Sequence, residues 1–497
     1  MMNIVDKDYP FKTEPRKHQY DSWMRSRKQR YHAHLMEMGT GKTKITIDEC
    51  AYMYDNGWID SMLIFGNKGS YTNWVEEIET HLPSHIGKVV VVWTSTMNNK
   101  ETGRLEKIIS YHGNGLKILL MNIEALAFER SFKAAYQFAI NHDTMGIVDE
   151  STTIKNPTAK RTKAAWKIGE VCKARRILTG SLIDNRPLDA WAQFEFLKKG
   201  LLGYSSYFAY KCKYAELVRV RVPDNRINKT GHSTDGKREV LIVKGYRNLE
   251  CLKQSISKYA TIIKKDECLD LPPKIYQKYC IELTEEQRKL YEQMKNKALI
   301  ELENTIVSTK IVLTKLLRLH QITCGFLKDD DGNMHEIKSN RLIALQTILE
   351  ESQDKAIIWA NYRYSIQGIE TMLKKEYGPE SVRTYYGDTT SDERQVVKQE
   401  AKRGVETNMR WLISNQASGG YGNTWTAFNL VVYYANCFDG ELRNQSEDRC
   451  HRIGQTKSVT YIDIVAKDTI DEKILKILKD KKTMSDMITP SNWREWF

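Results

Sequence analysis

Short apolar runs alternate with amphipathic stretches over the first part of the chain. The runs have the length of buried strands, and the stretches between or after them have helical periodicity. The runs occupy residues 31–36, 61–66, 88–93, 116–122 and 145–150, and two of the helical stretches occupy 73–80 and 158–171. Strands that alternate with helices are joined by right-handed crossovers and form a parallel sheet. The pattern predicts an α/β lobe over residues 1–260, with a less regular insertion at about 198–260.

The same alternation returns nearer the C-terminus. Strand candidates occupy 355–360, 381–386, 409–414, 428–434 and 459–465, with helical candidates at 363–376, 391–403 and 443–452. This pattern predicts a second α/β lobe over 341–497 that ends in a helical segment. Residues 261–340 are expected to form a connector and a helical protrusion, because 284–323 read as one long basic amphipathic helix.

Composition narrows the class of protein. The 497 residues are 41% hydrophobic and 28% charged, and no run approaches the roughly 18 apolar residues of a membrane span. Nine scattered cysteines without a CxxC pair favour a reducing compartment and free thiols, so we expect a cytoplasmic protein. A net charge of +13 permits a polyanionic partner without identifying it.

The segment LMEMGTGKTK, residues 35–44, lies between a strand candidate and a helix candidate. Gly39 and Gly41 would let backbone N–H groups approach phosphate, and the helix that follows would add its positive end. Lys42 would reach the β and γ phosphates and Thr43 would hold Mg²⁺. Met36 stands where the strict phosphate-loop pattern has glycine. The expected ATP-binding residues here are Met38, Gly39, Thr40, Gly41, Lys42 and Thr43; the alternative is a plain glycine turn with a surface lysine.

Two acids follow the apolar run that ends at Val148. Because open α/β sheets bind ligands at the carboxyl ends of their strands, Asp149 and Glu150 are expected to face the nucleotide. Asp149 suits water-mediated coordination of Mg²⁺, and Glu150 suits deprotonation of the attacking water. The alternative is an ordinary exposed Asp-Glu pair.

Several segments, taken in order, resemble one family. They are PRKHQYDSW (15–23), MLIFGNKGSYTNW (62–74), DESTTIKNPTAKRTKAAW (149–166), LTGSLIDNRP (178–187), YYGDTTSDER (385–394), ASGGYGNTWTA (417–427) and QSEDRCHRIGQTKSV (445–459). Together they resemble the Swi/Snf-like DNA translocases of helicase superfamily two, over about residues 15–480. The resemblance implies an α/β fold of two RecA-like parallel-sheet lobes in tandem, with helical insertions.

The resemblance also assigns roles to individual residues. It implies that Gln19 reads adenine, and that Arg16 and Gly422 also bind the nucleotide. Nucleic-acid contacts are expected at Lys68, Asn73, Trp74, Asn122, Lys155, Asn156, Asn415 and Gln416. Of these, Lys68, Asn73 and Trp74 either lie near the tracked strand or support its loop. Coupling between the nucleotide site and the nucleic-acid contacts is expected at Thr179, Gly180 and Ser181.

The last of these segments has a physical interpretation of its own. Gln445, Arg449 and Arg452 are spaced by four and three residues, so a helix over 443–452 would place them on one face. Guanidinium groups are planar, permanently charged and bidentate toward phosphate. If the second lobe closes on the first, the two arginines would meet the γ-phosphate, so all three residues are predicted to be catalytic together with Lys42. The alternative is a solvated basic helix face.

The chain departs from the family pattern at a few positions. Thr152 replaces the usual histidine of the acidic motif, and Leu182 replaces the proline of the coupling motif. Asn415-Gln416 stands where the family has a Ser-Thr pair. These departures concern coupling more than ATP binding.

The resemblance predicts an ATP-hydrolysing motor that uses ATP and Mg²⁺. It is expected to act as a monomer, to translocate on double-stranded or branched DNA mainly through phosphate contacts, and to remodel DNA structures or protein–DNA complexes. One alternative is a helicase that separates strands of DNA or RNA. A second is a nucleic-acid platform that binds ATP as a switch without turnover.

Overall fold

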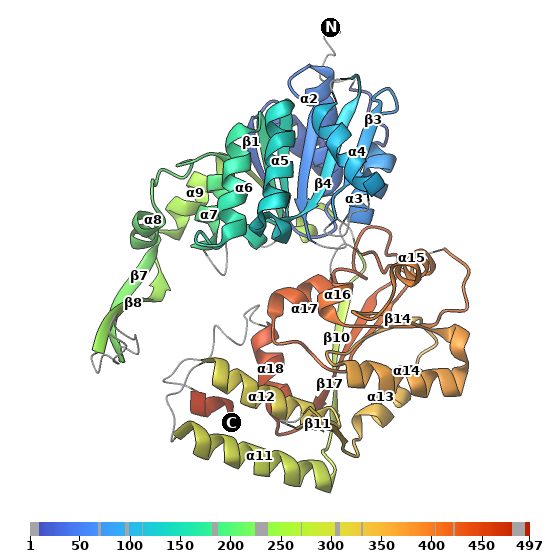
Figure 1. Ribbon diagram of the computed structural model, residues 1–497. Helices are drawn as coiled ribbons and strands as arrows, with labels where there is room; N and C mark the ends of the chain where they lie inside the picture. Colours follow the sequence, from blue (N-terminus) through green and yellow to red (C-terminus); the bar gives the residue numbers. More distant parts are fainter. Residues whose placement is uncertain are drawn as a thin grey trace. The chain divides into compact units, whose positions relative to one another are not determined.

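The computed structural model describes residues 9–67, 71–94, 99–111, 113–180, 187–223, 237–269, 271–303, 309–329, 332–402, 404–420, 423–479 and 493–497. The chain forms two compact units, Met1–Cys268 and Leu269–Phe497. Each unit is built around its own β-sheet (Figure 1). The boundary between the units lies eight residues after the predicted end of the first lobe.

The first unit contains a seven-stranded sheet in the order β3-β4-β2-β5-β6-β1-β9. Its strands are β1 (Tyr31–Met36), β2 (Ser61–Gly66), β3 (Lys88–Val92), β4 (Leu116–Asn122), β5 (Thr144–Asp149), β6 (Ala174–Thr179) and β9 (Ala260–Ile263). Every neighbouring pair is parallel. The predicted parallel α/β lobe is therefore confirmed, with β6 and β9 as strands that the apolar pattern missed.

Helices cover both faces of this sheet. The helices of this unit are α1 (Lys17–Ser26), α2 (Lys42–Asp55), α3 (Tyr71–His81), α4 (Asn99–Ser110), α5 (Glu129–Asn141), α6 (Lys160–Val171), α7 (Asp189–Leu197), α8 (Tyr207–Tyr214), α9 (Leu249–Ser257) and α10 (Lys265–Cys268). Alternate residues of β2 point to opposite faces, so Met62 and Ile64 pack with α1–α3 while Leu63 and Phe65 pack with α4–α7. Figure 1 shows α5 and α6 lying across one of these faces.

The insertion predicted as irregular contains a β-ribbon. β7 (Ala215–Pro223) pairs antiparallel with β8 (Lys237–Tyr246), and a β-bulge lies between Glu216 and Leu217. The ribbon follows α8 directly, and the Arg247 N–H donates to the Tyr214 carbonyl where the chain returns. The expectation of a helical or irregular insertion is thus wrong for 215–223 and 237–246, whereas α8 and α9 agree with its helical part.

The second unit contains a six-stranded sheet in the order β10-β17-β16-β13-β15-β14. Its strands are β10 (Lys274–Ile281), β13 (Ala356–Trp359), β14 (Val382–Tyr385), β15 (Trp411–Ser414), β16 (Leu430–Tyr433) and β17 (Val459–Ala466). All neighbouring pairs are parallel, so the second predicted lobe is also confirmed. β10 lies in the predicted connector, yet it pairs along its whole length with β17.

The helices of the second unit differ from the expectation in two places. They are α11 (Glu285–Glu303), α12 (Thr309–Thr323), α13 (Arg341–Glu350), α14 (Arg363–Tyr377), α15 (Ser391–Glu400), α16 (Gln416–Gly419), α17 (Gly440–Glu447) and α18 (Ile470–Lys479). The run predicted as one helix over 284–323 is described as two helices, α11 and α12. α17 ends at Glu447, five residues before the predicted end. The short strands β11 (Phe326–Lys328) and β12 (Met334–Glu336) form a separate hairpin.

Over the described residues, no helix has both the length and the apolar character needed to cross a membrane.

Candidate nucleotide-binding site

The predicted phosphate-binding turn connects β1 to α2. Gly39 has φ 81° and Gly41 has φ 93°, backbone values that favour glycine. Lys42 is the first residue of α2, and its ammonium group donates to the Met36 carbonyl over 2.8 Å. The half-buried Thr43 follows in the first helical turn. The structure therefore gathers a lysine, a hydroxyl and a helix N-terminus around a glycine turn, the arrangement that binds phosphate.

Helix α1 packs directly on this turn. Gln19 is buried, its side-chain oxygen accepts from the Arg16 N–H over 2.9 Å, and its amide nitrogen donates to the Thr40 carbonyl over 3.2 Å. The His18 Nε2 lies 2.8 Å from the same carbonyl oxygen. A Cβ on Gly41 would collide with the Gln19 amide. Gln19 and Arg16 thus lie beside the turn, as the resemblance implied, and the φ of 93° favours glycine at residue 41.

A buried ion pair holds α2 against the sheet. Glu49 of α2 and Arg176 of β6 are fully buried, and the guanidinium Nε donates to the carboxylate over 2.7 Å. His34 of β1 contacts the other carboxylate oxygen over 3.1 Å. Burial alone would raise the pKa of Glu49, but Arg176 and His34 hold it below its usual range. Glu49 is therefore ionised, and its pairing fixes the helix that begins at Lys42.

The acidic pair lies where β5 ends. Because β5, β6 and β1 are parallel neighbours in that order, Asp149 and the phosphate-binding turn are at the same edge of the sheet. Glu150 has φ 49° and ψ 61°, the left-handed region, which a residue other than glycine occupies only at a cost. The Asp149 Oδ2 accepts from the Trp74 indole over 2.9 Å, and its Oδ1 accepts from the Glu150 N–H over 3.1 Å. The fold thus holds the Asp149 carboxylate and places both acids at the carboxyl edge of the sheet, where open α/β sheets bind ligands.

The predicted coupling residues lie at the end of the neighbouring strand. Thr179 is the last residue of β6 and is buried. Gly180 follows it, and a Cβ there would be in ordinary contact, 3.6 Å, with Met36 and Met38. These two residues therefore pack beside the phosphate-binding turn, and Ser181 lies outside the described residues.

In the second unit, the two arginines meet without sharing a helical face. Because α17 ends at Glu447, Arg449 and Arg452 lie in the turns that follow it. The Arg449 Nη1 and the Arg452 Nη1 both donate to the Asn423 carbonyl over 3.2 Å, and the Arg449 Nε donates to the Gly420 carbonyl over 2.7 Å. The prediction of one helical face is wrong, but the glycine-rich segment brings both guanidinium groups together.

Gln445 remains on α17, and its side chain is buried. Within the described part of the chain, its Oε1 has no hydrogen-bond partner. A buried amide oxygen without a partner is costly and requires an explanation. Gly422, the other nucleotide-binding residue predicted in this unit, lies outside the described residues.

Comparison with protein families matches both units. The model of the SNF2-related domain matches residues 18–326, and the model of the helicase conserved C-terminal domain matches 338–454. The first match alone covers more than half of the chain. The chain belongs to the SNF2-related family. Each of its two units contains a parallel sheet.

Curated relatives of this SNF2-related chain include longer proteins. An uncharacterized ATP-dependent helicase of Mycoplasma genitalium is 29% identical over 90% of this chain and 39% of its own length. A putative ATP-dependent helicase/translocase of Bacillus subtilis is 28% identical over 70% of this chain and 36% of its own. The TATA-binding protein-associated factor MOT1 of Saccharomyces cerevisiae is 27% identical over 69% and 20%. The chain therefore spans about two fifths of the length of the first two relatives.

Among solved structures, the SWI2/SNF2 ATPase core of Sulfolobus solfataricus in complex with dsDNA aligns with 100% of this chain and 96% of its own. The TM-score is 0.42 and the sequence identity is 23%.

Four of the residues for which the SNF2 resemblance implied nucleic-acid contact are at least partly accessible in the first unit: Asn73, Asn122, Lys155 and Asn156. Asn122 caps the 3₁₀ turn after β4 by accepting from the Glu124 N–H, and Asn156 accepts from the Thr158 N–H and hydroxyl. The Lys155 ammonium lies 3.6 Å from an Asp189 carboxylate oxygen. Lys68 lies outside the described residues.

Two other predicted contacts are buried. The side chain of Trp74 is 1% exposed and bonds to Asp149, so it supports the acidic pair and offers no surface to a strand. Gln416 is 2% exposed, its oxygen accepts from the Cys437 N–H, and its nitrogen donates to Ser446. The prediction of direct contact with nucleic acid is therefore wrong for the Gln416 side chain, and for Trp74 burial leaves the supporting role, the other alternative that the resemblance implied. Asn415 is half-buried and caps α16 by accepting from the Ser418 N–H.

Sequence reasoning missed residues that act through others. Arg176 was not identified, although an arginine inside the strand-length segment ARRILT is a signal that a buried acid must be nearby. The bond from Trp74 to Asp149 spans 75 positions and has no local signature. Lys274 has no local signature, because β10 (KIYQKYCI) mixes polar and apolar residues and contains no strand-length apolar run.

Proposed function

We propose that this protein is an ATP-hydrolysing motor that moves along double-stranded DNA. The observation that carries the proposal is the glycine turn with Lys42 at the same sheet edge as Asp149 and Glu150. A basic lysine, a helix N-terminus and two neighbouring carboxylates suit a magnesium–triphosphate, in which negative phosphate and positive metal are bound together. Membership of the SNF2-related family supports the same assignment.

The residues around the turn fit ATP in a defined way. Backbone N–H groups of residues 39–43 would hold the phosphates, and Lys42 would exchange its bond to the Met36 carbonyl for the β and γ phosphates. The Thr43 hydroxyl and the Asp149 carboxylate would hold Mg²⁺, which supplies charge neutralisation to the phosphates. Gln19 would turn its amide from Thr40 toward adenine.

Hydrolysis requires a water molecule that loses a proton as it attacks phosphorus. We assign Glu150 as the base, because its carboxylate follows directly after the metal-binding Asp149. The left-handed backbone of Glu150 turns the chain sharply at the end of β5, and such strained residues are concentrated at functional sites. The N–H of Glu150 is already held by the Asp149 carboxylate, so the direction of this turn is fixed before ATP arrives.

We assign Arg449 and Arg452 to the transition state. Their guanidinium groups would stabilise the charge that develops on the transferred phosphoryl group, a contribution that affects turnover more than ATP binding. Their bonds to the carbonyls of Asn423 and Gly420 hold both groups in one place, so they act as a pair.

The proposed track is duplex DNA, bound through its phosphates. The net charge of +13 and the partly accessible Lys155 and Asn156 support binding that is independent of sequence and sensitive to salt. Remodelling of DNA structures or protein–DNA complexes, without extensive strand separation, is what the family resemblance favours. A strand-separating helicase and an ATP switch without turnover are the rival functions.

One set of measurements tests the proposal. ATP hydrolysis is measured with blunt duplex, forked DNA, single strands and RNA, each over a salt series. We expect the strongest stimulation with duplex, weakening as salt rises. Stimulation by RNA alone would favour the strand-separating alternative, and strand-displacement assays would identify it.

Glu150→Gln separates a motor from a switch. This variant should keep ATP affinity and lose hydrolysis by about 10²–10⁴-fold, the usual contribution of a general base. Glu129→Gln, the same change at an exposed position on α5, is the matched control and should hydrolyse ATP like the parent chain. Hydrolysis in Glu150→Gln at the parental rate would refute the assignment of the base, and a parent chain that binds ATP without turnover would favour the switch.

A further inference from the structure

The chain enters the second unit next to the segment that carries the two arginines. The unit begins at Leu269, and β10 begins at Lys274. The Lys274 ammonium lies 3.2 Å from a carboxylate oxygen of Glu447 and 3.2 Å from one of Asp448. Both acids immediately precede Arg449. The entering segment and the arginine segment are thus joined by ionic contacts.

A second contact joins the same two segments. The His451 Nε2 lies 2.7 Å from the Pro272 carbonyl oxygen, and His451 stands between the two arginines in sequence. Burial alone would lower the pKa of Lys274, but Asp448 and Glu447 raise it above its ordinary value, so the ammonium keeps its charge. The entering segment is therefore held on both sides of Arg449.

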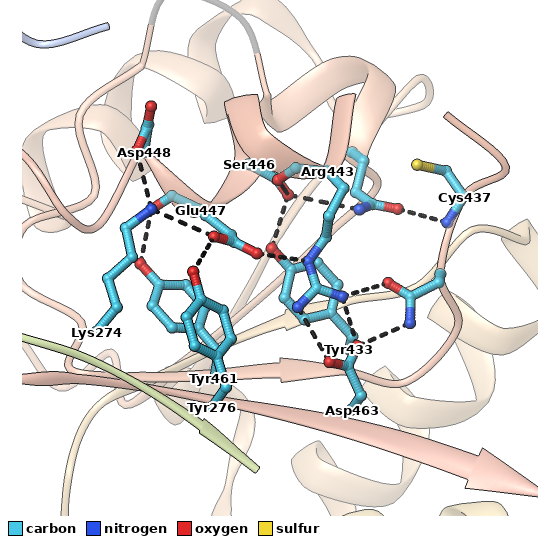
Figure 2. A network of polar contacts seen from close by, with 12 residues as sticks. Lys274, Tyr276, Tyr433, Cys437, Arg443, Ser446, Glu447, Asp448, Tyr461 and Asp463 are labelled. Atoms are coloured by element: carbon cyan, nitrogen blue, oxygen red, sulfur yellow. Dashed lines mark hydrogen bonds and ion pairs between the residues drawn. The ribbon is translucent and has the colours of Figure 1, made fainter. Parts of the chain in front are cut away.

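Glu447 connects these contacts to the sheet, as Figure 2 shows. Its Oε2 accepts from Lys274 and from the Tyr276 hydroxyl, over 3.2 and 2.7 Å. Its Oε1 accepts from the Arg443 Nε over 2.9 Å. Arg443 in turn forms a bidentate pair with Asp463 of β17 and lies over the Tyr433 ring. One carboxylate therefore joins β10, α17 and, through Arg443, the central strands.

The arginines are fixed from the other side by the glycine-rich segment. The Trp425 N–H donates to the Arg449 carbonyl over 2.9 Å, and the Arg449 side chain donates to the carbonyls of Gly420 and Asn423. Arg449 is consequently held between two anchors, the glycine-rich segment and the segment that enters the unit. A displacement of either anchor would move both guanidinium groups.

We propose that Lys274 and His451 are positioning residues that make the arginine pair follow the segment entering the second unit. Any motion of the chain at Leu271–Pro272 would then be transmitted to Arg449 and Arg452 and would set the rate of hydrolysis. The inference rests on the proposed function, because it concerns the charge that the arginines supply in the transition state. The substitution Lys274→Met removes the cation while keeping a long side chain.

The kinetic test separates positioning from general stability. In Lys274→Met we expect kcat to fall by about tenfold or more with KM for ATP and duplex affinity within about twofold, because transition-state contacts affect kcat alone. Lys274→Arg keeps the charge and should restore most of the rate. Lys278→Met is the matched control, since Lys278 lies on the same strand and pairs with Glu472, away from the arginines. An equal loss in both methionine variants would overturn the proposal.

A double-mutant cycle tests whether Lys274 acts through the arginines. Arg452→Ala alone should lose most of kcat and keep DNA binding. If Lys274 acts by positioning the arginine pair, Lys274→Met should lower kcat by a much smaller factor in the Arg452→Ala background than in the parent chain. If Lys274→Met lowers kcat by the same factor in both backgrounds, the inference is overturned, while Arg452 keeps its proposed role.

A measurement that needs no turnover separates this inference from the proposed function. Amide hydrogen exchange over residues 447–455 should become faster in Lys274→Met and stay unchanged in Lys278→Met. Unchanged exchange in both variants would overturn the positioning role. If the parent chain hydrolyses no ATP, the proposed function fails and, with it, the effect on rate, whereas the exchange result still decides whether Lys274 holds the arginine segment.

Discussion

The bond between the Trp74 indole and Asp149 gives a prediction whose magnitude can be derived from the structure. Trp74 is 1% exposed, and its Nε1 donates to the Asp149 Oδ2 over 2.9 Å. Trp74→Phe keeps an aromatic ring in the core and removes the donor. A hydrogen bond to a charged group contributes about 1.5–3 kcal/mol, so this variant leaves the carboxylate less firmly held by that amount.

The effect should appear as a changed requirement for magnesium. Mg²⁺ needs nearly ideal octahedral geometry, so a carboxylate that is free to rotate is a poorer partner for it. If about half of the lost hydrogen-bond free energy had served to orient Asp149, the binding free energy of Mg²⁺ weakens by roughly 1 kcal/mol, which is about a fivefold weaker affinity. We expect the Mg²⁺ concentration that half-saturates binding of a fluorescent ATP analogue to rise about fivefold, with metal-free nucleotide binding unchanged.

Trp191→Phe is the control for this experiment. Trp191 is also buried in the first unit, and its Nε1 donates to the Tyr204 carbonyl over 3.3 Å, away from the acids. Both variants should lower the melting temperature, because each loses a buried bond and some packing. Only Trp74→Phe should change the Mg²⁺ requirement. An equal Mg²⁺ requirement in the two variants would show that Trp74 supports the core and has no effect on Asp149.

Two further predictions concern the glycine turn and a buried histidine. Gly41→Ala should weaken ATP binding by about tenfold or more, because φ 93° is strained for alanine and its Cβ would collide with the Gln19 amide. The control is Gly57→Ala, which is strained at φ 68° but lies in open space and should bind ATP normally. Equal ATP affinities of the two variants in titration would contradict the argument. Burial lowers the pKa of His320 to about 4 despite the neighbouring Asp471, so the folded state binds fewer protons than the unfolded one between about pH 6.5 and 4. Unfolding free energy should therefore fall by up to about 3 kcal/mol as pH drops through that window, and His320→Gln should remove this part of the fall in urea titrations, whereas an unchanged pH profile would contradict it.

The predicted strands came from apolar runs, and the missed ones show why such runs are insufficient. β6 carries two arginines in six residues and so looks polar, yet Arg176 is neutralised by Glu49, 127 positions away. β10 exposes many of its side chains, pairs only with β17 and contains no strand-length apolar run, so its sequence resembles that of a surface segment. Contacts between distant residues decide both cases, and sequence periodicity carries no information about them.

The candidate site was predictable where its chemistry is local. The glycine turn and the acidic pair each occupy consecutive residues, and the order of strands brings them to one edge. The helical face proposed for Arg449 and Arg452 failed because no glycine or proline between 441 and 453 marks the end of α17. The arginine side chains instead donate hydrogen bonds to the carbonyl groups of Gly420 and Asn423, which lie in a separate segment.

One guanidinium explains how the surroundings of the glycine turn are held together. All five N–H donors of Arg176 are used: Nε bonds to Glu49 of α2, and the terminal nitrogens bond to carbonyls of Ser26, Gln29, Arg30 and Arg175. It therefore ties the end of α1, the middle of α2 and β6 to one another.

Those three elements are also the ones that contact the glycine turn, through Gln19, Lys42 and Gly180. Replacing a buried ion pair by apolar residues of similar volume often leaves stability unchanged or higher, so stability alone is a poor reason for the pair of Arg176 with Glu49. Its geometry gives a better one. Because the guanidinium group is planar and fixed in shape, it sets the distances between three elements at once. An apolar side chain would fill the space without defining where the Lys42 end of α2 lies relative to β6, and the phosphates require that position to be defined.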